Sequence, residues 1–403
     1  MSKPAVESCQ RCLYSTSHPL GLVLDEKGIC SGCRVHEEKD SLDWDERWDR
    51  LERLVKPYRS RNNRNYDCIV PVTGAGDSFF IVHLVKERLK LNPLLVTYNR
   101  YYNTPLGIRN LAQLRRHFNC DILIQNVNPR SVKKISRTTL RLLGSFHWPA
   151  LAGQSVFPVQ TAVTHGIPLI LWGAHQGVEQ VGMFSHLHEV EMTRRYRKDH
   201  DLMGFEADDL LSLFDTLAEE DIWQYRYPDE AELGKVGVRG IYLGNYVRWD
   251  PLAQHLQMVK TAKYHSAQMS RTFDVYDHVD DWHYMGMHDC IKQKKHGFGR
   301  VLDQACREIR HQRICRDEAI GLVQKYQSQS SNADNLLLEW LNIDRRSLEF
   351  IITHHTRESP EPSLSQAPKR VNVQAFLNDF VPNDRLELSG EKRHVVIGKG
   401  YPD

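Results

Sequence analysis

A buried strand that leads directly into a glycine loop and a helix most constrains the fold of this 403-residue chain. The strand is predicted at 66–72, an apolar run rich in β-branched residues. The loop 73–78 reads Thr-Gly-Ala-Gly-Asp-Ser, and helical periodicity begins at Ser78. Glycines let backbone N–H groups approach an anion, and the unpaired amides of a helix start carry partial positive charge. The pattern therefore predicts a phosphate-binding turn, with an ordinary tight strand-to-helix turn as the alternative.

The loop resembles the PP-loop, the Ser-Gly-Gly-x-Asp-Ser motif of enzymes that split ATP into AMP and pyrophosphate. It is neither a P-loop ending in Gly-Lys-Ser/Thr nor a Gly-x-Gly-x-x-Gly motif. Gly76 stands where many members carry Lys, so another basic residue would have to supply that phosphate-facing charge. The resemblance implies Mg²⁺-dependent ATP binding, with Asp77 in a catalytic role. The implied ATP-binding residues in this loop are Thr73, Gly74, Ala75, Gly76, Asp77 and Ser78.

Strands and helices alternate after this motif. Strands are predicted at 93–98, 120–125 and 167–172, and helices at 104–118, 129–143 and 156–165. Such alternation implies a parallel sheet with helices on both faces and ligands at the carboxyl ends of its strands. Beyond about residue 200 the pattern is mostly helical, with one short strand at 238–243 and helices at 206–218, 251–263, 299–313, 316–327 and 332–341.

Two Cys-x-x-Cys pairs near the start of the chain predict a metal site. They are Cys9 with Cys12, and Cys30 with Cys33. Two thiolates from each of two short knuckles give a tetrahedral four-sulfur set that suits a closed, structural Zn²⁺. An iron–sulfur cluster, and disulfides or free thiols, are the alternatives. Because about 40 residues cannot build a core alone, we expect the metal to stabilise this ribbon directly.

These features predict an α/β fold: a parallel-sheet ATP pyrophosphatase domain of the PP-loop type, an N-terminal zinc ribbon and a mostly helical C-terminal part. The segments expected are the ribbon at 1–40, a connecting helix and linker at 41–65, the PP-loop domain at 66–250, a helical substrate or partner region at 251–357, and a linker and tail at 358–403.

The charge and hydropathy of the chain bear on its partners and location. A net charge of +2 gives no support for a surface that coats nucleic acid. No apolar run approaches the roughly 20 residues that span a bilayer. The first residues lack the apolar stretch of a signal peptide. We therefore expect a cytoplasmic protein without nucleic-acid binding or membrane insertion.

A second candidate loop, 172–180, follows the strand predicted at 167–172. It loosely resembles the Gly-His-x-x-Asp type of loop that PP-loop enzymes often carry there. Gly173 is expected to contact ATP, His175 to position nucleotide, ammonia or a transferred proton, and Glu179 to bind Mg²⁺. We expect both His175 and Glu179 to be catalytic. A polar but inert loop is the alternative.

Two further stretches are rich in titratable side chains. In the stretch 183–200, His186 and nearby carboxylates suit polarisation of a substrate amide, and Arg194 belongs to a basic group that suits phosphates. In the stretch 292–300, Lys295 and Arg300 lie beside glycines ahead of a predicted helix, which again suits anionic groups. We expect His186 in catalysis and the three cations at the phosphates or carboxylate of a sugar nucleotide. A solvated helix face and a charged loop without ligand are the respective alternatives.

The order of motifs resembles the N-acetyl sugar amidotransferase family of the PP-loop superfamily. The shared motifs are the double Cys-x-x-Cys ribbon, the loop 73–78, Leu151-Ala-Gly153 with Phe157-Pro158, the stretch 167–175, and His-Gly-Phe-Gly-Arg at 296–300 with the run 303–309. The resemblance covers about residues 9–355. It implies that the acetamido group of a nucleotide-linked sugar is converted to an acetamidino group. This reaction would serve the biosynthesis of bacterial surface polysaccharide such as O antigen.

The resemblance also implies partners. Ammonia would come from a separate glutaminase through a cyclase-like barrel subunit, and no region of this chain reads as a glutaminase domain. Two other functions stay open. A tRNA thiolase of the PP-loop superfamily would activate a base carbonyl in the same way, and a zinc-ribbon adaptor with an altered loop would not hydrolyse ATP.

Overall fold

The computed structural model describes residues 6–61, 64–276, 282–331 and 334–356. At its centre lies a five-stranded sheet, all parallel, in the order β3-β2-β1-β4-β5. The strands are β1 (Cys68–Pro71), β2 (Pro93–Tyr98), β3 (Ile122–Gln125), β4 (Leu169–Trp172) and β5 (Arg239–Tyr242). This confirms the predicted α/β fold with a parallel sheet. The tail predicted at 358–403 lies outside the described residues.

Helices cover both faces of the sheet, as the buried strands require. The helices of the sheet region are α3 (Gly76–Val82), continued by a π-helix (His83–Arg88), α4 (Pro105–Phe118), α5 (Pro129–Leu143), α6 (Trp148–His165), α11 (Glu230–Val236) and α12 (Pro251–Ala262). Apolar residues of α3, α4 and α12 form one core with the β1 side chains Cys68 and Val70. Ile69 points the other way, into the core that includes α6.

Shorter helices lie between the sheet strands and beyond them. Between β4 and β5 the chain forms α7 (Gln176–Glu179), α8 (Arg194–Tyr196), a π-helix (Arg197–Asp201), α9 (Ala207–Leu213) and α10 (Glu219–Ile222). The C-terminal part contains α13 (Met285–His296), α14 (Arg300–Arg310), α15 (Arg316–Gln327), α16 (Asp334–Leu341) and α17 (Arg345–His355). The mostly helical character predicted for this part is therefore confirmed.

Local sequence signals set several helix starts. Asp43 accepts hydrogen bonds from the N–H groups of Asp45 and Glu46 and so caps α2 (Trp44–Val55). Thr104 caps α4 from the Gly107 N–H, with Pro105 at the first helical position. The helix predicted at 156–165 begins earlier, at Trp148, because Pro149 occupies its first turn and Pro158 is accommodated inside the helix.

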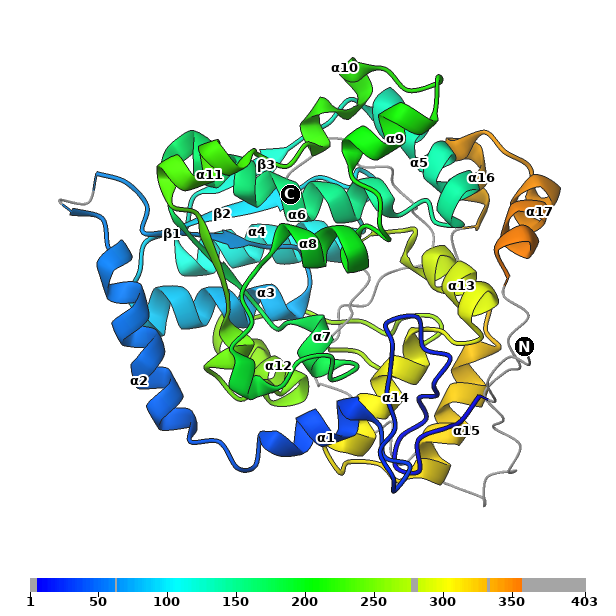
Figure 1. The fold of residues 1–403 in the computed structure, drawn as a ribbon, viewed down its shortest axis with the longest axis horizontal. Coiled ribbons are helices and arrows are strands. Elements are labelled where there is room, and N and C mark those ends of the chain that lie inside the picture. Colours follow the sequence, from blue (N-terminus) through cyan, green and yellow to red (C-terminus); the bar gives the residue numbers. More distant parts are fainter. Residues whose placement is uncertain (1–5, 62–63, 277–281, 332–333, 357–403) are drawn as a thin grey trace.

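The N-terminal ribbon packs against the C-terminal helices. Its buried side chains, including Leu13 and the four paired cysteines, share a core with Ile309 of α14 and Val323 of α15. Figure 1 shows the ribbon, in dark blue, beside α14 and α15, with α1 (Ser31–Glu38) leading away from it toward α2. The ribbon therefore buries its apolar surface against segments some 300 residues away in sequence.

Candidate functional site

The carboxyl ends of β1 and β4 define the site. From β1 the chain continues to β2 and β3 on one side, whereas β4 and β5 lie on the other side of β1. Ile69 of β1 pairs directly with Ile170 of β4. Loops that leave neighbouring strands at such a reversal of strand order form the usual ligand crevice of an open parallel sheet. The loop 73–78 and the loop beginning at Gly173 leave β1 and β4 at this reversal of strand order.

Side-chain hydroxyls organise the loop after β1. The N–H of Thr73 donates to Ser78 Oγ at 2.9 Å, and the N–H of Ala75 donates to Thr73 Oγ1 at 3.1 Å. The threonine at position 73 thus uses its hydroxyl inside the loop, as a serine would. Asp77 lies exposed in the first turn of α3. The predicted ATP-binding role of these residues remains a prediction.

A buried side-chain amide that no sequence pattern marked supports the loop 73–78. Asn110 of α4 is fully buried and donates to the carbonyl oxygens of Gly74, at 3.2 Å, and His265, at 2.9 Å. Its own Oδ1 accepts from the His265 N–H at 3.2 Å. Asn110 therefore ties the loop to the segment that follows α12.

That segment also covers the loop at the position where many PP-loop proteins carry Lys. A Cβ atom on Gly76 would lie 2.9 Å from Tyr276 O and 3.2 Å from the Tyr264 ring. A Cβ on Gly74 would lie 2.5 Å from Gly107 O. The absence of a side chain at position 76 therefore has a steric reason, because backbone and aromatic atoms fill the space that a lysine stem would need.

His175, in the loop after β4, is held as a neutral hydrogen-bond donor. Its Nδ1 accepts from the Gly177 N–H at 3.0 Å, so the ring proton lies on Nε2. Burial, together with the charge of His200, lowers the pKa of His175 to about 4. The Nε2 atom is buried without a hydrogen-bond partner among the described residues. Tyr196 and Tyr242 flank the ring, with centroids 4.3 and 4.6 Å away.

Asp201, which the sequence analysis missed, is near enough to these two tyrosines for its charge to act on both. It ends the π-helix Arg197–Asp201, and burial raises the pKa of its carboxyl to about 6. Its charge adds to burial in raising the pKa of Tyr196 and of Tyr242. Single-turn π-helices are frequent at functional sites. The titratable stretch at 183–200 was the available sequence signal, and Asp201 is the next residue.

Glu179 and His186, both predicted to be catalytic, lie together and face the ribbon. Lys39, next to the end of α1, places its Nζ 2.6 Å from Glu179 Oε2. His186 is 1% exposed, with Nε2 3.7 Å from Glu179 Oε1 and Nδ1 3.4 Å from Glu38 Oε2. Burial raises the pKa of Glu179, but Lys39 and His186 outweigh this and lower it to about 2. The Glu179 carboxylate thus has a structural partner, and the catalytic roles of both residues remain predictions.

The three cations predicted to bind substrate come from different elements and contact protein groups. Arg194 pairs with Glu206 at 2.6 Å. Lys295 donates to Leu143 O at 2.5 Å, and Arg300 NH2 donates to Ser270 O at 2.6 Å. The stretch 292–296 forms the last turns of α13 and is therefore not the charged loop given as the alternative for 292–300; the break before α14 is confined to 297–299. The substrate-binding roles of these cations stay predictions.

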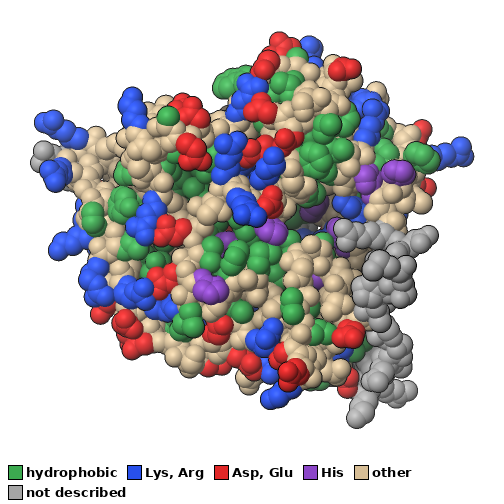
Figure 2. All heavy atoms as spheres, viewed as in Figure 1, with side chains coloured by type: hydrophobic (Ala, Val, Ile, Leu, Met, Phe, Trp, Pro, Cys, Tyr) green, Lys and Arg blue, Asp and Glu red, His purple; other side chains and the backbone are tan. Residues whose placement is uncertain are grey.

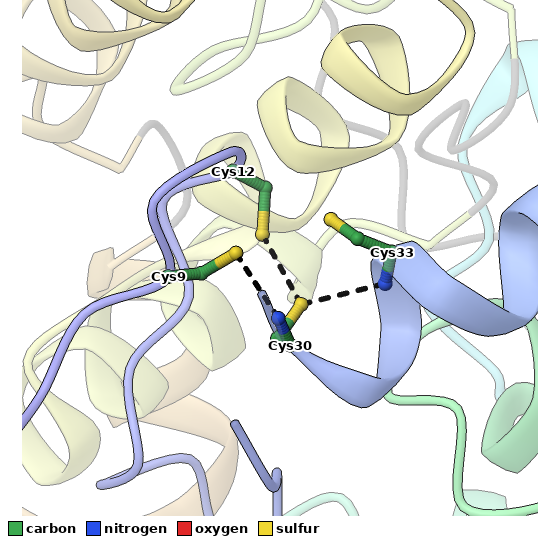
Figure 3. A group of neighbouring side chains, drawn as sticks. All are labelled: Cys9, Cys12, Cys30 and Cys33. Carbon is green, nitrogen blue, oxygen red and sulfur yellow. Dashed lines mark hydrogen bonds between the residues drawn. The ribbon is translucent and has the colours of Figure 1, made fainter. Parts of the chain in front are cut away.

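The four paired cysteines form a compact buried cluster. Their sulfur atoms all lie within 4.8 Å of one another, and Cys12 Sγ is 3.6 Å from Cys30 Sγ. A tetrahedral ion with Zn–S bonds of about 2.3 Å needs sulfur separations of roughly 3.8 Å, so the arrangement fits zinc. Backbone N–H groups of Cys30 and Cys33 donate to the sulfurs of Cys9 and Cys30, which is visible in Figure 3. The cluster could therefore hold a structural zinc ion.

The surface and the helices outside the site carry little further information about partners. On the face shown in Figure 2, basic and acidic side chains are interspersed over the described residues. None of the helices in the described part of the chain combines the length and the apolar character that a bilayer-crossing segment needs.

The fold and the site thus define an α/β protein with a parallel sheet, two loops that leave it at a reversal of strand order and an N-terminal cysteine cluster. Comparison with known families adds that residues 261–361 match the C-terminal domain of LPS biosynthesis proteins that are WbpG-like. This match supports the family resemblance that the sequence motifs indicate, and it supports a role in polysaccharide biosynthesis. The matched segment includes α13 to α17 and the residues that cover Gly76.

A curated relative adds little about activity. The uncharacterized protein MJ1599 of Methanocaldococcus jannaschii is 25% identical over 121 residues. The aligned part covers 29% of this chain and 42% of the relative. The chain therefore spans less than half of that relative's length.

Proposed function

We propose that this chain is an ATP-dependent amidotransferase that converts an acetamido group of a sugar to an acetamidino group during the building of bacterial surface polysaccharide. The observation that carries the proposal is the pairing of a PP-loop-like turn after β1 with the His175 loop after β4 at one reversal of strand order. The WbpG-like match of residues 261–361 supports the substrate class.

The chemistry explains why ATP is needed. An amide carbonyl is a poor electrophile, and its oxygen is a poor leaving group. Transfer of AMP from ATP to that oxygen releases pyrophosphate and gives an activated imidate. Ammonia then attacks the imidate carbon, AMP leaves with the oxygen, and loss of a proton from nitrogen gives the amidine.

The described residues suggest how the chain contributes to these steps. In the loop 73–78 the Thr73 and Ala75 N–H groups donate to hydroxyls of the loop itself, and the loop leads into the start of α3, where helix-start N–H groups are of the kind that hold phosphate oxygens. The neutral His175 ring offers its Nε2–H as a donor, which suits an acetamide oxygen or a phosphate better than it suits proton abstraction. Asp201 is better suited to accept the proton that nitrogen loses, because burial raises the pKa of its carboxyl to about 6.

The decisive test uses the purified chain with ATP, Mg²⁺, ¹⁵N-ammonium and a panel of diacetamido sugar nucleotides. We expect one ¹⁵N atom in the sugar product by mass spectrometry, with AMP and pyrophosphate formed in equal amount. Asp77→Ala should abolish product formation and leave the fold intact by circular dichroism. Release of ADP and phosphate would contradict the proposal, and absence of any nucleotide cleavage with every sugar would favour the adaptor function.

The source of ammonia is tested in the same assay. We expect the chain alone to use ammonium at alkaline pH, where more free ammonia is present. We expect it to use glutamine only when a glutaminase and its barrel-type partner are added. Glutamine-dependent product formation by the pure chain would contradict this part of the proposal.

A further inference from the structure

Two side chains of α14 lie against the cysteine cluster. Cys306 and Arg310 are four residues apart and so share one helix face. Cys306 Sγ accepts from the Leu13 N–H at 3.3 Å, within the first knuckle. Arg310 NH2 lies 3.8 Å from Cys30 Sγ. The helix thus presents a sulfur and a guanidinium to the metal site from outside the ribbon.

The guanidinium of Arg310 also reaches the loop that follows β4. Its NH1 donates to Glu179 O at 3.0 Å and to Gln180 O at 2.7 Å. The side chain is only 7% exposed, so water contributes little to its solvation. One buried guanidinium therefore joins the sulfur of Cys30 to the carbonyl groups of Glu179 and Gln180. These carbonyls lie at the end of α7, four and five residues after His175.

Charge explains why a cation is needed here. Four thiolates and one Zn²⁺ leave a net charge of −2, and a buried charge is costly unless an opposite charge compensates it. Arg316 supplies a second guanidinium, whose NH1 donates to Cys9 O at 2.9 Å and to Cys12 O. Unlike Arg316, Arg310 combines a sulfur contact with contacts to the β4 loop.

Close packing leaves little freedom at this junction. A Cβ atom on Gly32, between Cys30 and Cys33, would lie 2.7 Å from Gln180 O and would also meet the Arg310 guanidinium. Ser31 Oγ donates to Val181 O at 2.6 Å. The second knuckle, Arg310 and the loop 176–182 therefore move together or lose these contacts together.

We propose that Arg310 is a positioning residue that couples metal occupancy of the cysteine cluster to the order of the loop 176–182. With metal bound, the thiolate charge holds the guanidinium, and the guanidinium holds the loop carbonyls. When the metal leaves, the two knuckles are no longer held together, and the contact between Cys30 Sγ and the buried guanidinium is no longer fixed. The loop next to His175 then loses its anchor.

Hydrogen exchange on the full-length protein tests this coupling. We expect amides in 176–182 to exchange faster after zinc is removed with a strong chelator, and to regain protection when Zn²⁺ is added back. Loop protection that does not respond to zinc, or a purified chain that holds no metal, would overturn the proposal. Neither measurement depends on ATP or on a sugar substrate, so failure here is distinct from failure of the proposed function.

Variants of Arg310 separate its role from that of the other knuckle contacts. We expect Arg310→Gln to weaken zinc affinity by about 10- to 100-fold, the usual effect of losing an outer-sphere partner, and to raise exchange in 176–182 even with zinc bound. Arg310→Lys keeps the charge but not the fork, so it should retain more zinc affinity than Arg310→Gln and still loosen the loop.

The matched control is Arg313→Gln. Arg313 pairs with Asp250 and Glu308 and lies three residues from Arg310. The control should change neither zinc affinity nor exchange in 176–182. Equal behaviour of Arg310→Gln and Arg313→Gln would overturn the proposal, and equal zinc affinity of the Lys and Gln variants would contradict its charge argument. If Arg310→Gln does not fold, the metal-removal experiment on the unsubstituted chain decides.

Discussion

The ammonium group of Lys39 lies 2.6 Å from Glu179 Oε2 and is 1% exposed. Lys39 also donates to Trp249 O at 3.0 Å. The pair joins the N-terminal ribbon helix to the loop after β4, across 140 residues of sequence. A carboxylate that the sequence pointed to as a Mg²⁺ ligand is thus also a structural anchor.

Removal of the lysine should destabilise the protein strongly. Lys39→Met leaves the partly buried Glu179 carboxylate without its cation, and the loss should approach about 3–5 kcal/mol, the cost of breaking a fully buried pair. The double variant Lys39→Met/Glu179→Leu should recover most of this loss, because apolar residues of similar volume can replace a buried ion pair. Urea unfolding measures both free energies.

An exposed ion pair provides the control for that experiment. Arg226 lies 2.7 Å from Glu219, and both side chains are more than a third exposed. Arg226→Met should cost no more than about 1 kcal/mol, as is usual for surface pairs. A Lys39→Met protein that is as stable as the Arg226→Met protein would contradict a stabilising role for the buried pair.

The cysteine cluster should make stability depend on metal. We expect about one zinc ion per chain by elemental analysis, as one four-thiolate site implies. Cys33→Ser should lose the metal and lower the melting temperature, because the ribbon and its junction with α14 and α15 depend on it. Cys120→Ser, a buried cysteine outside the cluster, is the control and should keep the zinc. A metal-free preparation with the melting temperature of the zinc-containing protein would argue against the site.

A methyl group at position 76 should destabilise the protein, whereas one at position 234 should not. Gly76→Ala places a Cβ 2.9 Å from a backbone oxygen, and such overpacking typically costs about 1–3 kcal/mol. Gly234 lies inside α11, with nothing within 4 Å of the added Cβ. Gly234→Ala should therefore stabilise the protein by up to about 1 kcal/mol. Thermal unfolding measures the stability of both variants. Equal changes in melting temperature would contradict the close packing of Tyr264 and Tyr276 on the loop 73–78.

Because of Asp201, the free energy of unfolding should decrease as the pH rises from about 4 to about 6. The Asp201 pKa rises from 3.8 in the unfolded chain to about 6 in the folded protein, so the folded state holds the proton longer. Well below pH 3.8 the Asp201 carboxyl is neutral in both the folded and the unfolded state, so it does not affect stability. As the pH rises through 6, the folded protein must bury a charged carboxylate. The full penalty, present above pH 6, is about 2–3 kcal/mol.

Asp201→Asn removes that penalty and provides the measurement. The variant should be more stable than the unsubstituted protein at pH 7.5, and the difference should shrink toward zero near pH 4. Unfolding by urea at several pH values gives this difference directly. A difference that is independent of pH would show that the buried charge is not its origin.

The sequence predicted the sheet well because its signals are local. Strand β2 and helix α5 have the bounds that their apolar periodicity predicted, and Asp43 caps α2 where its pattern indicated a helix. The cysteine pairs at 9–12 and 30–33 predicted their own cluster, because two short knuckles with two thiolates each can converge only on one small site. The stretch 292–300 was expected to lie ahead of a helix, but its residues 292–296 end a helix of their own, α13, which the sequence analysis did not delimit.

Only the tertiary structure decided what surrounds the site. Nothing local marks Asn110 as the support of Gly74, Lys39 as the partner of Glu179, or Arg310 as the neighbour of Cys30. The residues of each pair are from 36 to 280 positions apart in sequence. The sequence by itself determined the parallel strands, most of the helices and the sulfur set, whereas the strand order and its reversal came from the tertiary structure. Burial determined the partners and the pKa values, because a side chain loses its water only where distant elements pack together.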